Sequence, residues 1–262
     1  MAGYMWQAVS IFKIVILTAV VIASIVFMKR NDRRNPAFMT FFTLGTGCYL
    51  CTEIYYISNL LLKDSDRLPY FSAEDIGTYG GILLLTSCLH AAFPHKGSYN
   101  RRHIIFSAGF SLANAGLYVY YGTESISALI YAVVFGMFMA VILQCLEDMG
   151  ALSRTGLNFF YAGSAVLCIL LIAELFVNEQ LTAVLGTAEA VFWFSAIVWL
   201  TICTVEALRK KQPEAVPFSF AVFLVCIFAM YMSYDPWYSI ADILSALITF
   251  PILLSLSREV ES

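Results

Sequence analysis

The sequence predicts an all-α protein, a polytopic transmembrane helical bundle with about nine spans. Long apolar runs fill almost the whole chain, and a bilayer-spanning helix needs about 20 predominantly apolar residues. Charged residues make up 13% of the chain, against about 25% in a soluble globular domain. No connection between the runs is long enough for a separate soluble domain. The chain is therefore expected to form one integral membrane domain over residues 1–262.

The first span is expected to remain in the protein. Met1 to Gln7 lacks the basic region of a secretory signal, and no small-residue cleavage site follows. Most later spans are bounded by charged connections, but the eighth and ninth are separated only by Tyr234-Asp235-Pro236-Trp237, a turn-like segment because proline cannot continue a helix. In chain order, the expected spans are 6–28, 37–62, 75–94, 103–121, 125–147, 157–177, 183–208, 217–233 and 238–256.

Basic residues fix the expected orientation. Most of them fall in the connections after the odd-numbered spans or after the last span: Lys29, Arg30, Arg33, Arg34, Lys96, Arg101, Arg102, Arg154, Arg209, Lys210, Lys211 and Arg258. Cytoplasmic loops carry the excess of lysine and arginine. The N-terminus is therefore predicted outside and the C-terminus in the cytoplasm, most simply in the cell (plasma) membrane.

Composition offers little support for a cofactor or a metal. Seven cysteines lie in or near the spans, where they are expected to pack as small apolar residues, and the Cys48-x-x-Cys51 pair lacks further ligands. His90, His95 and His103 are close in sequence, but Lys96, Arg101 and Arg102 among them repel a cation. That connection is expected to serve topology or to contact anionic headgroups.

Ionisable residues inside the spans are the first candidates for function, because a charge in hydrocarbon is costly and needs a partner, a cavity or water. The topology places these residues from five spans in one layer of the outer half of the bilayer: Lys13, Glu53, Glu174, Glu189 and Asp242. Asn114 lies just past the middle of its span on the same side. The alternatives are that Glu174 and Glu189 reach headgroups and that Lys13 extends outward to water.

Helical spacing groups further polar residues with these. Residues three and four apart share a helix face, and three polar stripes follow this rule: Thr46, Tyr49, Glu53 and Tyr56; Ser107, Ser111, Asn114, Tyr118 and Tyr121; and Tyr238, Asp242, Ser245 and Thr249. Such stripes should face the bundle interior. The sequence therefore predicts a polar cavity in the outer half, with these ligand-binding residues: Tyr49, Tyr56, Asn114, Tyr118, Glu189 and Asp242.

Several short segments resemble the YhhN-like lysoplasmalogenase family. They occur in family order over about residues 8–180: Phe12-Lys13-Ile14, Thr52-Glu53-Ile54, Gly81 with His90, Tyr131 with Met137, and Ala173-Glu174. The family hydrolyses the vinyl-ether bond of lysoplasmalogens. The resemblance implies that Glu53 and Glu174 are the acid and base and that Lys13 and His90 support them.

Three functions remain open from the sequence. The favoured one is binding of a small amphipathic or lipid-like ligand in the outer-half cavity, with hydrolysis of a lysolipid ether bond as the implied reaction. Buried acids could equally carry a proton in a small-molecule transporter. A membrane sensor or assembly subunit could recruit a partner through the basic loops. Membrane lipids are expected partners and nucleic acid is not, while the oligomeric state is left open.

Overall fold

The computed structural model describes residues 2–31, 36–63, 72–95, 97–120, 125–151, 154–174, 176, 179–232 and 237–261. Ten helical segments account for nearly all of them, and the described residues form no strand. Their bounds are α1 (Ala2–Arg30), α2 (Ala37–Lys63), α3 (Ala73–Ala92), α4 (Arg101–Tyr120), α5 (Ser125–Asp148), α6 (Arg154–Glu174), α7 (Glu179–Lys210), α8 (Ala215–Met232), α9 (Trp237–Leu247) and α10 (Thr249–Glu261).

The all-helical fold expected from the sequence is confirmed, and each predicted span coincides with a helix or, for the last, with α9 and α10 together. Within the described residues, four helical stretches are long and apolar enough to cross a membrane: Gln7–Arg30, Ile126–Asp148, Val184–Lys210 and Trp237–Val260. Gly156–Leu170 and Ala215–Met230 are shorter apolar helices. Nine crossings and the orientation of the termini stay predictions. Residues 234–236 of the predicted turn lie outside the described residues, and its fourth residue, Trp237, begins α9.

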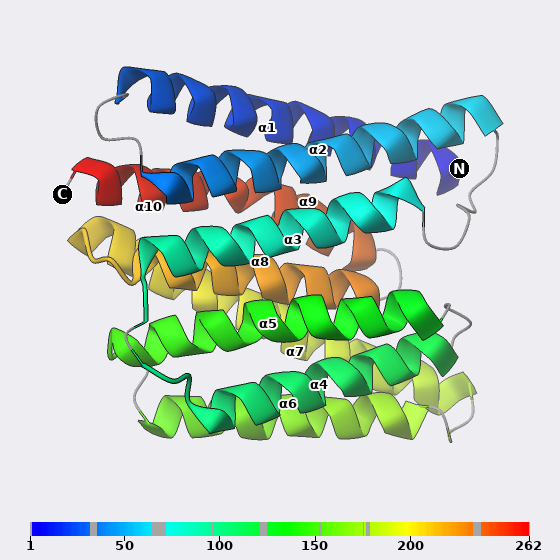
Figure 1. Cartoon of the computed structure of the whole chain (residues 1–262). Coiled ribbons are helices and arrows are strands. Elements are labelled where there is room, and N and C mark those ends of the chain that lie inside the picture. Colours follow the sequence, from blue (N-terminus) through cyan, green and yellow to red (C-terminus); the bar gives the residue numbers. More distant parts are fainter. Residues whose placement is uncertain are drawn as a thin grey trace.

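The helices form a bundle in which sequential neighbours from α1 to α9 run antiparallel, and α10 continues the direction of α9 (Figure 1). Helix α8 is its centre, contacting α5, α7, α9 and α10, and residues 215–229 are buried without interruption. Large apolar side chains stay exposed on the outer helices, such as Val15 on α1, Ile105 on α4 and Ile169 on α6. An apolar exterior around a packed centre is the surface that a lipid environment requires.

Two local features follow directly from the sequence. Helices α2 and α3 approach closely at Gly45 and Gly81, where a Cβ atom on Gly81 would lie 3.1 Å from the Gly45 carbonyl oxygen. The α9–α10 helix is interrupted at Ile248 because Pro251 has no N–H to donate to the Leu247 carbonyl and its ring crowds that carbonyl.

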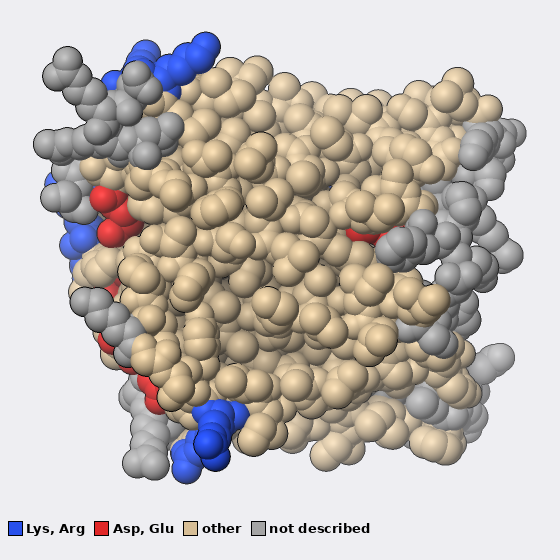
Figure 2. Space-filling view, in the orientation of Figure 1, with Lys and Arg blue, Asp and Glu red and all other residues tan. Residues whose placement is uncertain are grey.

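Charged residues gather at one end of the bundle. Figure 2 shows most of the basic and acidic side chains of this face toward its left end, and one acidic spot on the right side of an otherwise uncharged surface. We call the left end the basic end, and it is where α1 and α7 finish and α4 and α8 begin (Figure 1). Its described basic residues include Lys29, Arg30, Arg101, Arg102, Arg209, Lys210 and Arg258.

Candidate functional site

Three ionisable side chains from three helices meet in the bundle interior. The Lys13 ammonium of α1 donates to a Glu53 carboxylate oxygen of α2 and to Asp242 Oδ1 of α9, the latter at 2.5 Å. Each of these residues keeps 6% or less of its surface exposed. We call Lys13, Glu53 and Asp242 the buried triad. It joins the first two helices of the chain to the last part of the bundle.

Helix geometry explains why these positions meet. Lys13 lies 17 residues before the end of α1 at Arg30, roughly 26 Å along the helix axis. Glu53 lies 16 residues after the start of α2 at Ala37, roughly 24 Å from the same end of the bundle. Because α1 packs on both α2 and α9, residues at one depth on these helices can touch. The depth expected from the topology thus brings Lys13, Glu53 and Asp242 into contact.

Tyr49 forms the neighbouring layer, one turn before Glu53. The Lys13 ammonium lies 5.2 Å from the centre of the Tyr49 ring, within the range of a cation–π contact. The Tyr49 hydroxyl and Ser245 Oγ are 2.8 Å apart, and Ser245 Oγ donates to the Asp242 backbone carbonyl at 2.7 Å. Tyr56 is half-buried on the same helix. One lysine faces two carboxylates, so the triad carries a net charge of −1 when all three groups are ionised.

The remaining predicted ligand residues lie in other parts of the bundle. Asn114 is fully buried on α4, which packs on α5 and α6, and its side-chain amide donates to the Phe110 carbonyl at 2.7 Å. Glu189 is buried on α7, which packs on α8 and α6. The side chains of Tyr118 and Glu174 lie outside the described residues.

His90 is not near the triad. A Cβ atom on Gly77 of α3 would collide with the hydroxyl of Thr52, the neighbour of Glu53, so Gly77 marks the depth of the triad. His90 follows 13 residues later on the same helix, roughly 20 Å farther along its axis. Its Nδ1 atom lies 3.0 Å from the Tyr99 hydroxyl. The structure therefore brings Lys13 and Glu53 together and separates His90 from them.

A large apolar groove lies between α3, α4 and α5, in the half of the bundle nearer the basic end. Its volume is about 800 Å³. We call it the lateral groove. Small side chains create the hollow, while a few polar groups mark its basic end. The lining includes Phe41, Thr86, Ser87, His90, Tyr99, Ile104, Ala108, Leu112, Ala132, Gly136, Met137 and Ala140. The polar cavity expected from the sequence would lie at the depth of the buried triad, away from this groove. The triad side chains expected there are tightly paired with one another.

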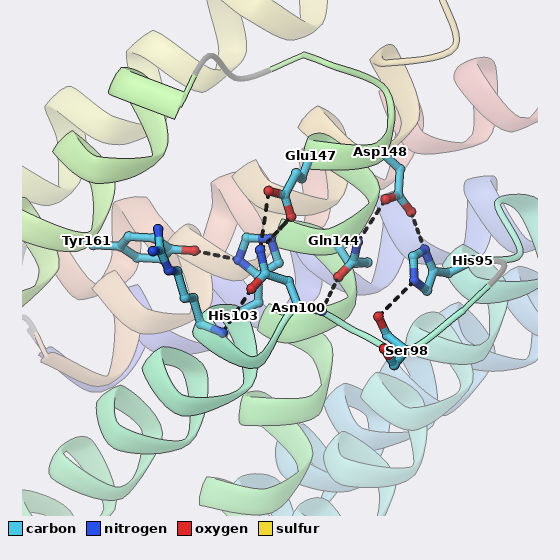
Figure 3. Close-up of polar contacts among 9 residues, drawn as sticks. His95, Ser98, Asn100, His103, Gln144, Glu147, Asp148 and Tyr161 are labelled. Atoms are coloured by element: carbon cyan, nitrogen blue, oxygen red, sulfur yellow. Dashed lines mark hydrogen bonds and ion pairs between the residues drawn. The ribbon is translucent and has the colours of Figure 1, made fainter.

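A second polar cluster occupies the basic end (Figure 3). It begins at His103 of α4, whose Nδ1 lies against the Tyr161 hydroxyl of α6 and whose Nε2 lies 2.7 Å from the Glu147 carboxylate of α5. The side-chain amide of Asn100 donates to the same carboxylate at 2.9 Å, and the backbone N–H of Asn100 donates to Gln144 Oε1 at 2.8 Å. Sequence spacing did not reveal this cluster.

The cluster continues from Gln144 to the loop before α4. Gln144 Nε2 donates to Asp148 Oδ1 at 2.8 Å, and the other Asp148 oxygen lies 2.7 Å from His95 Nδ1. The hydrogen bond to Asp148 raises the pKa of His95 from its ordinary value of 6.5. We call the whole cluster the basic-end network; its members are His95, Asn100, His103, Gln144, Glu147, Asp148 and Tyr161.

One signal in the sequence could have revealed the network. The two acids at the end of α5 and the histidine at the start of α4 lie at the same end of two antiparallel neighbours. The sequence reading instead placed His103 in a connection that serves topology. In the structure α4 begins at Arg101, and His103 is 1% exposed.

No family model, curated protein or solved structure matches the chain.

Proposed function

We propose that the protein is a multi-pass membrane protein that binds a lipid-like amphipathic molecule in the lateral groove. It crosses the membrane nine times, with its N-terminus outside and its basic end in the cytoplasm of the cell. The observation that carries the proposal is the groove itself. Its volume of about 800 Å³ lies within the range of ligand pockets, roughly 300–1,000 Å³.

The groove has the polarity of a single-chain amphipath. Ala108, Leu112 and Ala132 supply an apolar path on the bundle surface for an alkyl chain. His90 and Tyr99 supply polar groups near the basic end, where a headgroup would lie. Each buried methylene contributes about 0.8 kcal/mol. That gain is measured from water, and a chain already in the bilayer has it, so preference for the groove over the bilayer must come from recognition of the headgroup.

Bound lipid tests the proposal. The purified protein is loaded with lysophospholipid, and retention is measured by native mass spectrometry for wild type, Ala108→Phe and Ile105→Phe. The phenylalanine at 108 fills the groove, whereas Ile105 is 72% exposed on the same helix and is absent from the groove lining. Retention lost in Ala108→Phe and kept in Ile105→Phe supports the proposal. Equal retention in all three proteins contradicts it.

The geometry supports binding more than hydrolysis at the buried triad. Glu53 lies 12 residues beyond the groove residue Phe41 on α2, roughly 18 Å along the axis. A ligand in the groove would have to extend that far for its ether bond to reach Glu53. Turnover of a panel of lysophospholipids, vinyl-ether forms included, compared between wild type and Glu53→Gln, tests the reaction that the family resemblance implies.

The buried triad favours a second function, proton-coupled transport of a small molecule. Two carboxylates share one ammonium away from water, and such groups in a membrane interior commonly mark proton relays. Lysophospholipid movement across reconstituted vesicles under an imposed pH gradient is the test. A carrier shows gradient-dependent movement that Asp242→Asn abolishes and Glu206→Gln, at an exposed position on α7, preserves. Movement that ignores the gradient contradicts this function.

A further inference from the structure

A polar pocket separate from the lateral groove opens among α4, α5 and α6 at the basic end. Its volume is about 400 Å³. The side chains that matter for its chemistry are Asn100, Arg102, His103, Glu147, Asn158 and Tyr161. Figure 3 shows that His103, Glu147 and Tyr161 converge from three helices. A pocket walled by several polar groups from separate helices is a site for a small polar ligand or headgroup.

His103 is held by the groups on its two sides. The imidazole is 1% exposed, with Nε2 against Glu147 and Nδ1 against the Tyr161 hydroxyl. A carboxylate can only accept, so Nε2 carries the proton and donates to Glu147. The unprotonated Nδ1 then accepts from the Tyr161 O–H. This one neutral tautomer gives the carboxylate, the imidazole and the phenol each a hydrogen-bond partner.

The pocket lining contains one positive group, Arg102, and one negative group, Glu147. Glu147 is engaged by Asn100 and His103. In the part of the chain that the structure describes, the Arg102 guanidinium forms no ion pair with a carboxylate. Helices α4 and α6 begin at this end and α5 ends there, so two positive helix ends and one negative end face this region, which on balance favours an anion. The planar donors of arginine match an oxyanion such as phosphate, sulfate or carboxylate.

We propose that this pocket binds an oxyanion between Arg102 and Tyr161 and that binding loads one proton onto His103. An anion accepts the Tyr161 O–H, which turns the phenol proton away from the imidazole. Nδ1 then faces only an oxygen lone pair unless it gains a proton. With that proton, His103 donates to Tyr161 through Nδ1 and to Glu147 through Nε2, so every group is again satisfied. The anion is a free oxyanion or the phosphate of a lipid headgroup.

The charged and titratable groups around His103 allow this change. Glu147 and Asp148 of α5 lie on the carboxylate side, Tyr161 of α6 lies on the pocket side, and Arg101 and Arg102 precede His103 on its own helix. The acids of α5 stabilise an imidazolium, and the bound anion offsets the repulsion from the arginines. Proton uptake and anion binding therefore support each other.

Sulfate is the probe for the free anion because it does not titrate near neutral pH. Wild type in neutral-lipid nanodiscs is titrated calorimetrically with sulfate in two buffers of different ionisation enthalpy. The expected uptake is about one proton per bound sulfate. Arg102→Gln should bind at least about tenfold more weakly. Arg101→Gln is the matched control, because Arg101 is exposed and is not among the pocket residues.

Two variants test the proton itself. His103→Gln and Tyr161→Phe should each lose the uptake, and the second keeps the imidazole should the first fail to fold. Native mass spectrometry then compares retained phosphatidylglycerol with phosphatidylcholine, which identifies a headgroup as the occupant if Arg102→Gln alone loses the preference. No binding of either probe, equal weakening in Arg101→Gln and Arg102→Gln, or sulfate binding without proton uptake overturns the proposal.

Discussion

The buried triad and the basic-end network lie at different depths of the same bundle, and their charged groups are paired in different ways. The buried triad holds one ammonium between two carboxylates with almost no exposure. The basic-end network spreads its charge over amides, imidazoles and carboxylates, and the Glu147 side chain remains 39% exposed. The comparison indicates that the stability of the triad depends on its one cation. In the network, exposure to solvent and several hydrogen-bond donors can replace a lost partner.

Removal of the cation from the triad should have the largest effect. Lys13→Met leaves Glu53 and Asp242 facing each other in the interior, and breaking a buried pair costs about 3–5 kcal/mol. The free energy of unfolding in detergent measures the loss. Lys29→Met, at an exposed site on the same helix, should change it by less than about 0.5 kcal/mol. Similar losses in the two variants would show that Lys13 has no special role.

Removal of one carboxylate from the triad should cost less than removal of the lysine. In Glu53→Gln, Lys13 keeps Asp242 as its partner, and in Asp242→Asn it keeps Glu53. We expect each variant to lose about 1–2 kcal/mol, because one charge-assisted hydrogen bond becomes neutral while no buried charge is left alone. The same unfolding assay measures both. A loss as large as that of Lys13→Met would show that one remaining carboxylate is not enough to pair Lys13.

The same chemical change at the basic end should cost least. Glu147→Gln replaces a partly exposed carboxylate whose partners are Asn100 and His103. Pairs of this kind contribute about 0–1 kcal/mol, so the unfolding free energy should fall by less than in Glu53→Gln. A greater loss at position 147 than at position 53 would reverse the comparison between the two regions.

The basic-end network should also show a measurable shift in proton affinity without a large change in stability. The hydrogen bond to Asp148 raises the pKa of His95. The charged form of His95 therefore stabilises the fold below its unfolded pKa, and that contribution disappears as pH rises through the folded pKa. An NMR titration of the His95 ring should give a pKa above 6.5 that falls in Asp148→Asn. A pKa unchanged by that substitution would remove Asp148 as the cause.

Sequence patterns predicted the helices and the shared depth of the triad because both depend on apolar run length and on the alternation of basic loops. Contact between Lys13, Glu53 and Asp242 then required only that α1 lie beside α2 and α9. The break at Ile248 has a local cause in Pro251, which the prediction of one continuous span over 238–256 does not take into account.

The groove and the basic-end network were beyond such patterns. The groove depends on where small residues such as Ala108, Ala132 and Gly136 leave space between three helices unfilled. The network depends on the rotamers of Asn100 and Gln144, whose amides link groups that look unrelated along the chain. Neither feature has a period or a fixed spacing.

Whether Lys13 stabilises both buried carboxylates is tested by the unfolding free energies of Lys13→Met and Lys13→Met/Asp242→Asn. The second substitution should restore part of the unfolding free energy, since it removes one of the two acids left without a cation. A double variant less stable than Lys13→Met would show that Asp242 contributes to stability independently of Lys13 and that the triad does not act as described.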